Sequence, residues 1–218
     1  MAKRKFKWPL SRRIPKEIQA AARKHARHIG EIVLAWTALQ DSLFCLFWIV
    51  STDHRYEDYP KSYAIWHMFQ SDKSQRNMIL EVARANTKLP KKLLAHIKWA
   101  VARTEDLSSF RNDAVHTPIK IRPYSSSPTV LVPMPNPVSA RKTAVERLMK
   151  KPTAKVWHSV RGDLVILAKF CDAIYSRIVV AGFSGPWPNR PHLQNVPRSS
   201  RKRRKNIGRG TTMLPPRT

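Results

Sequence analysis

Apolar positions recur three and four residues apart along much of this chain, which is the spacing of amphipathic helices that bury one face. Four segments show the pattern over several turns and are predicted to be helices, over 15–50, 61–87, 90–116 and 153–182. Pro15 and Pro90 suit the first turns of their helices. Ser71 or Asp72 can cap a restart if the second helix is interrupted.

The buried face of each predicted helix can be read from the same periodicity. The first helix has an apolar stripe from Ile18 to Val50, and the second has apolar positions such as Ile65, Phe69 and Ile79. The stripe of the third helix is Leu93, Ile97, Ala100, Thr104, Leu107 and Arg111. The stripe of the fourth helix is Val156, Val160, Leu164, Leu167, Cys171, Ile174 and Ile178. An arginine therefore stands where the third stripe would be expected to continue with leucine.

The stretch between the third and fourth helices changes character, because its prolines forbid a continuous helix. Within 117–138, IKIR and TVLV are predicted to be short extended pieces of an irregular hairpin. The predicted fold is all-α: an up-and-down helical bundle of four main helices with this Pro-rich irregular insertion between helices 3 and 4 and with basic flexible termini. The expected divisions are a basic N-terminal arm (1–14), the bundle (15–182) and a disordered basic Pro/Arg-rich tail (183–218).

Charge points to a polyanionic partner. The formal net charge is +27 over 218 residues, which favours nucleic acid and leaves an anionic membrane surface as the alternative. The tail holds a basic run that we expect to contact RNA phosphates, namely Arg201, Lys202, Arg203, Arg204 and Lys205.

Other features narrow the class of protein. The apolar stretch 32–50 is interrupted by Gln40-Asp41-Ser42, so we predict no transmembrane segment. Cys45 and Cys171 lie within helical patterns, and two cysteines form neither a disulfide framework nor a zinc signature. We therefore expect a cytoplasmic protein with no cofactor and no metal site.

The third helix ends in the segment SSFRNDAVHTP, residues 108–118, which holds the main candidate site. Pro118 disfavours helical geometry at the residue before it, so the helix should end near His116. Residues five apart on an ideal helix point about 140° away from each other. Arg111 and His116 can therefore converge only if the last turn relaxes or if two copies of the motif meet.

The run Arg111-Asn112-Asp113-Ala114-Val115-His116 resembles the R-N-x-x-x-H signature of HEPN (higher eukaryotes and prokaryotes nucleotide-binding) domains, which ends the third helix of a small four-helix bundle. Gly30, Trp36, Leu39 and Leu43 in the first helix are similar to the family's opening pattern, and the resemblance covers about residues 15–182.

The resemblance implies a metal-independent endoribonuclease that acts as a homodimer, with Arg111 and His116 of both copies as catalytic residues and Asn112 as an orienting residue. It also implies a toxin or phage-defence setting and leaves room for an acidic antitoxin or inhibitor protein. Two other interpretations stay open. One is a non-catalytic, basic nucleic-acid-binding helical protein, and the other is a bundle that binds membrane surfaces or other proteins.

Overall fold

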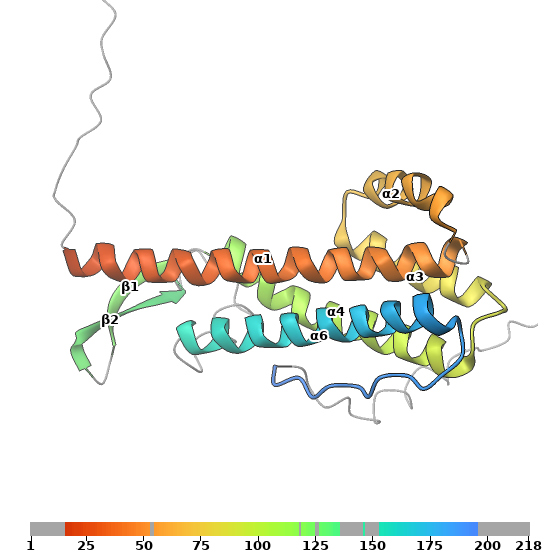
Figure 1. The fold of residues 1–218 in the computed structure, drawn as a ribbon. Helices are drawn as coiled ribbons and strands as arrows, with labels where there is room; N and C mark the ends of the chain where they lie inside the picture. Colours follow the sequence, from red (N-terminus) through yellow and green to blue (C-terminus); the bar gives the residue numbers. More distant parts are fainter. Residues whose placement is uncertain are drawn as a thin grey trace, which may run out of the picture.

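The computed structural model describes residues 16–52, 55–117, 119–124, 127–135, 146 and 153–195. The arm predicted at 1–14 and the basic run at 201–205 lie outside these ranges. The described residues are mostly helical, which confirms the all-α class (Figure 1). The helices are α1 (Lys16–Thr52), the short 3-10 helix η1 (Tyr56–Asp58), α2 (Tyr59–Met68), α3 (Asp72–Ala85), α4 (Lys91–His116) and α6 (Thr153–Ala181).

The second predicted helix is in fact two helices. The backbone adopts an extended conformation at Phe69 (φ −88°, ψ 110°), and α2 ends there. Ser71 then caps α3, where its hydroxyl accepts a hydrogen bond from the backbone N–H of Ser74 at 3.1 Å. The Gln75 side chain fastens the corner, since its amide donates to the backbone carbonyls of Trp66 and Phe69 at 3.1 and 3.3 Å. The capping expected at Ser71 is confirmed, and the chain reverses direction at this corner.

This extra reversal makes the strict up-and-down prediction wrong. Residues early in α1 contact residues early in α6, and residues late in α1 contact residues late in α6. Arg161 lies 4.0 Å from Glu31, and the ring centres of Trp48 and Tyr175 are 6.1 Å apart. The first and last helices therefore run parallel, as Figure 1 shows. An up-and-down bundle of four helices would place them antiparallel.

Helix α4 runs against its neighbours. Its contacts with α3 pair Asp72 with Arg111 and Arg76 with Glu105, so α3 and α4 are antiparallel. The end of α4 therefore lies at the end of the molecule where α3 and α6 begin. This arrangement determines which side chains surround the last turn of α4.

The core follows the predicted stripes on α4 and α6. Every stripe position on α6 is buried, and so is every position on α4 before Arg111. On α1 the buried positions begin only at Ile32, and Ile29 before it is partly buried against the core. The prediction that Ile65 and Phe69 face the core is wrong, since they are 39% and 40% exposed. Trp66, at 3%, takes the core position of α2 instead.

The apolar part of α1 belongs to this core. An 18-residue window of α1 has a mean hydropathy of 1.7, which is apolar enough to cross a membrane, but 61% of that window is buried inside the molecule. Cys171 on α6 is also fully buried, and burial raises the pKa of its thiol. Cys45 and Cys171 are both free, in keeping with the expected reduced, apolar role.

The predicted disordered tail is wrong for its first thirteen residues. Residues 183–195, here called the C-terminal strap, pack in an extended path against α4 and α6 (Figure 1) and bury Trp187 and Leu193. The Asp163 carboxylate on α6 accepts hydrogen bonds from the backbone N–H groups of Gln194 and Asn195, each at 2.8 Å. The apolar residues of this Pro-rich segment do not recur with the spacing of a helix or a strand. Their burial therefore could not be predicted from the hydrophobic pattern.

The insertion after α4 contains a two-stranded antiparallel hairpin. Strand β1 (Ile119–Tyr124) pairs with β2 (Ser127–Pro135), with Ile119 opposite Pro135 and Pro123 opposite Leu131. Both strands are edges, which is the place in a sheet where proline is tolerated. The hairpin contacts α1 and so lies near the end of α4.

Candidate functional site

The last turn of α4 keeps regular helical geometry up to His116. The N–H of Thr117 still donates to the carbonyl of Asp113 at 3.0 Å, and Thr117 itself is extended (φ −80°, ψ 121°). The prediction that the helix ends here, ahead of Pro118, is confirmed. The turn does not relax in a way that would bring Arg111 and His116 together.

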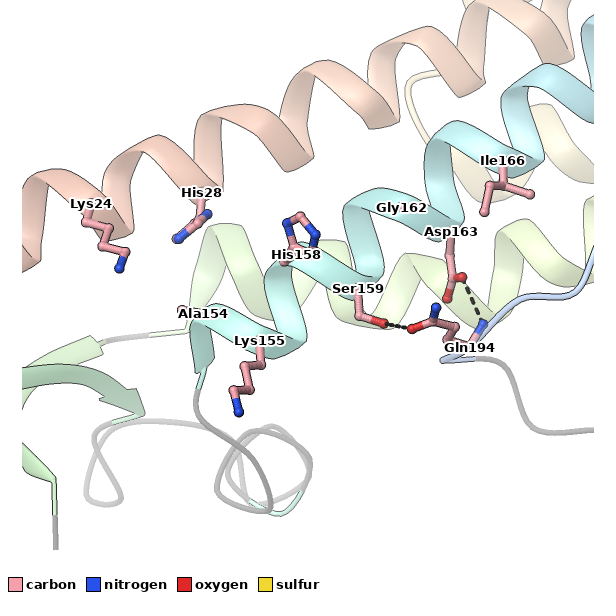
Figure 2. Close-up of a pocket in the computed structure, with 10 residues that line it drawn as sticks. All are labelled: Lys24, His28, Ala154, Lys155, His158, Ser159, Gly162, Asp163, Ile166 and Gln194. Atoms are coloured by element: carbon pink, nitrogen blue, oxygen red, sulfur yellow. Dashed lines mark hydrogen bonds between the residues drawn. The ribbon is translucent and has the colours of Figure 1, made fainter. Parts of the chain in front are cut away.

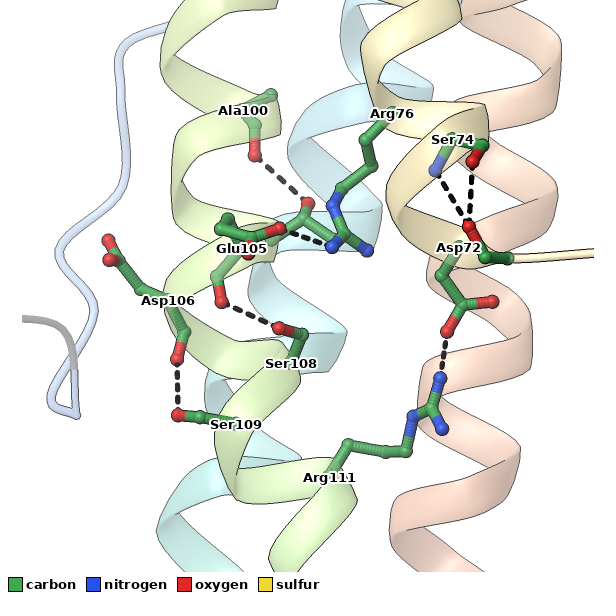
Figure 3. Close-up of polar contacts among 11 residues, drawn as sticks. Asp72, Ser74, Arg76, Ala100, Glu105, Asp106, Ser108, Ser109 and Arg111 are labelled. Carbon is green, nitrogen blue, oxygen red and sulfur yellow. Dashed lines mark hydrogen bonds and ion pairs between the residues drawn. The ribbon is translucent and has the colours of Figure 1, made fainter. Parts of the chain in front are cut away.

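Arg111 is held on the inner side of α4. Its guanidinium forms an ion pair with Asp72 in the first turn of α3 (Figure 3). The guanidinium carbon also lies 4.7 Å from the centre of the Trp36 ring on α1, within the range of a cation–π contact. Only 21% of the Arg111 side chain is exposed, and this burial lowers the pKa of its guanidinium. The group remains charged, because arginine does not lose its proton in proteins.

His116 and Asn112 lie on the outer side of the same turn. Both are exposed, and neither side chain makes a hydrogen bond or an ion pair with any other residue in the described ranges. Val115 beside them is 43% exposed. One copy of the chain therefore presents His116 and Asn112 to solvent while Arg111 faces α1 and α3. The structure places the three predicted residues in the last two turns of α4 but does not join them into one site.

A second arginine lies one turn along the same helix pair. Arg76 on α3 reaches back to Glu105 on α4, so Arg76–Glu105 and Arg111–Asp72 form two crossed ion pairs between the helices (Figure 3). The Arg76 side chain is only 4% exposed, and its Nε and Nη1 atoms are buried with no hydrogen-bond partner in the described part of the chain.

The periodicity of α3 could have revealed this buried arginine. Arg76 stands three residues before Ile79 and seven before Ala83, which is the spacing of one helix face, and all three are buried. The two ion pairs therefore join α3 and α4 on the N-terminal side of His116. They hold the backbone from which His116 projects.

Comparison with protein-family models, with curated proteins and with solved structures found no match for this chain. The link to HEPN domains therefore rests on the motif and on its place at the end of α4.

Proposed function

We propose that this protein is a metal-independent endoribonuclease that acts when two copies bring the ends of their α4 helices together. The observation that carries the proposal is the motif turn itself, with His116 and Asn112 exposed and Arg111 fixed beside them. The net charge of +27 supports RNA as the substrate, because it draws the chain to a polyanion. Such an enzyme would act in the cytoplasm, and an acidic protein would be suited to restrain it.

The chemistry suits these residue types. RNA carries its own nucleophile, the 2′-OH, which attacks the adjacent phosphorus and expels the 5′-oxygen to leave a 2′,3′-cyclic phosphate. A histidine near neutral pH can accept the 2′-OH proton or donate one to the leaving oxygen. An arginine can bind the phosphate oxygens as negative charge builds up on them.

A second copy is needed because one chain presents a single exposed histidine at this turn. Acid and base roles require two proton-transfer groups, and His116 of each copy would supply one. Val115 is the apolar side chain next to His116 that such a contact would cover. Arg111 would contact phosphate through the edge of its guanidinium that Asp72 and Trp36 leave accessible.

The test is cleavage of a labelled, structured RNA in EDTA by wild type and His116→Ala, with His192→Ala as the matched control. His192 is also exposed, but it belongs to the C-terminal strap and not to the motif. We expect wild type and His192→Ala to produce 2′,3′-cyclic phosphate ends and His116→Ala to lose at least about 100-fold in rate. Equal cleavage by all three proteins would overturn the proposal.

A second candidate function is non-catalytic RNA binding. The observation that favours it is that Arg111 is already engaged with Asp72 and Trp36, as a purely structural arginine would be. This alternative predicts salt-sensitive RNA binding by wild type and no cleavage. It also predicts that His116→Ala binds RNA as wild type does.

A further inference from the structure

A cavity of about 510 Å³ opens between α1, the start of α6 and the C-terminal strap, and no residue of the motif turn lines it. Figure 2 shows Lys24 and His28 reaching it from α1, and Lys155 and His158 from the first two turns of α6. Ser159 lines the same wall, and its hydroxyl donates to the Gln194 side chain at 2.9 Å. Basic and hydrogen-bonding side chains from segments about 130 residues apart in sequence thus meet at one hollow, here called the α1–α6 pocket.

The positive charge of this pocket is not neutralised by its neighbours. Lys24 and Lys155 are exposed and form no ion pair with any residue that the structure describes. The one carboxylate in the lining, Asp163, is buried and already accepts hydrogen bonds from the backbone of Gln194 and Asn195. The α1–α6 pocket therefore attracts an anion.

The nearest other carboxylate, that of Glu31, is also engaged. Arg27 donates to it at 3.0 Å, and Arg161 lies 4.0 Å away. His28 Nδ1 lies 3.8 Å from Glu31, beyond hydrogen-bond distance. Glu31 therefore faces His28 and two arginines, and it forms no ion pair with Lys24 or Lys155.

The His28 ring forms part of the pocket wall. Both nitrogens of its ring are buried and have no hydrogen-bond partner among the described residues, and 19% of its side chain is exposed. The accessible basic groups of the pocket are therefore Lys24 and Lys155, which would balance the charge of an oxyanion held there.

The beginning of α6 strengthens the preference for an anion. The helix starts at Thr153, and Ala154 and Lys155 of its first turn line the pocket. The first backbone N–H groups of a helix lack intrahelical partners and carry partial positive charge. Among the described residues, no three or more His, Cys, Asp or Glu side chains gather in a group that could hold a metal ion.

We propose that the α1–α6 pocket binds phosphates of an RNA backbone, a site separate from the motif turn. The choice of RNA rests on the proposed function. Along α1, Trp36, which stacks on Arg111, follows His28 by eight residues, or about 12 Å. An RNA strand is long enough to extend over this distance, whereas a free nucleotide would fill only the pocket.

The test is the salt dependence of binding to a fluorescently labelled single-stranded RNA, measured by anisotropy between 50 and 300 mM KCl. The test variant is Lys24→Ala/Lys155→Ala. The matched control is Lys91→Ala/Lys98→Ala, which removes the same charge from exposed positions on the first two turns of α4, at the opposite end of the molecule. Circular dichroism checks that each variant is folded.

Each lost phosphate contact lowers the slope of log K against log salt by about 0.7 for a single strand. We expect the pocket variant to lose about 1.4 in slope, and we expect the control variant to keep the slope of wild type. An equal loss of slope in both variants would overturn the proposal. It would show that RNA responds to the total charge of the protein and not to the lysines of the pocket. Calorimetric binding of AMP to wild type, lost in the pocket variant while the RNA slope stays unchanged, would also overturn it in favour of a small phosphate ligand.

This result can be separated from that of the cleavage test. The His116→Ala variant should keep the wild-type slope whether or not the protein cuts RNA, because His116 lies outside the pocket lining. Absence of cleavage together with a reduced slope in the pocket variant would retain the pocket and reject the ribonuclease. Cleavage by wild type, together with equal salt slopes for the two lysine variants, would retain the ribonuclease and reject the pocket.

Discussion

Replacement of Arg111 should destabilise the whole fold, because this side chain connects three helices. It forms an ion pair from α4 to Asp72 on α3 and stacks over Trp36 on α1 at 4.7 Å. With side-chain exposures of 21% and 31%, the ion pair is only partly screened and contributes about 1 kcal/mol. The partly buried cation–π contact adds about 1 kcal/mol. We therefore expect Arg111→Ala to lower the free energy of unfolding by about 2 kcal/mol.

The assay is urea unfolding followed by tryptophan fluorescence. With a slope of about 2 kcal/mol per M, the midpoint of Arg111→Ala should fall by about 1 M. Asp72→Asn should cost less, since it leaves the stacking on Trp36 in place. The double variant should show a coupling of about 1 kcal/mol between the two sites. Midpoints for Arg111→Ala and wild type that agree within error would refute this account of the contacts.

A loss of RNA cleavage in Arg111→Ala cannot by itself assign a catalytic role, because the variant is also expected to be less stable. His116 makes no such contacts within the described residues, so His116→Ala isolates the chemistry. Arg111→Lys, which keeps the charge but loses the planar group over Trp36, should be intermediate in stability.

Three further predictions follow from buried polar groups. Asp163→Ala should lower the free energy of unfolding by about 2–4 kcal/mol, because three hydrogen bonds to its buried carboxylate are lost. Amide exchange of residues 183–195 should accelerate, and a strap that stays protected from exchange would contradict its anchoring by Asp163. Glu105→Gln should destabilise the protein in urea more than Arg76→Met does, because it leaves the buried Arg76 charge unpaired whereas methionine fills the same space without charge; the opposite order would show that the pair itself is strongly stabilising. Burial, with smaller effects from nearby Arg190 and Lys92, lowers the pKa of His96 below its usual value, so the unfolded chain binds the proton more readily. The free energy of unfolding should therefore fall as the pH drops below about 6.5. The His96→Phe variant should lose part of that dependence, and an unchanged pH profile would argue against the contribution of His96.

The sequence by itself determined the features that depend on neighbours along the chain. The three- and four-residue spacing of Leu93 to Leu107 and of Val156 to Ile178 specifies which face of α4 and α6 is buried, and those faces are buried. Pro118 set the end of α4, and Ser71 set the start of α3. Such signals are local because they come from backbone sterics, capping and amphipathic period.

Only the tertiary structure decided what depends on segments distant in sequence. The corner at Phe69 made α1 and α6 parallel, and that direction brought Lys24 and His28 beside Lys155 and His158 in one pocket. The partners of Arg111 on α3 and α1 were equally outside the reach of pattern reading. Ion pairs and pockets form between side chains that meet only after the helices pack, and no periodicity within one helix specifies its neighbour's register.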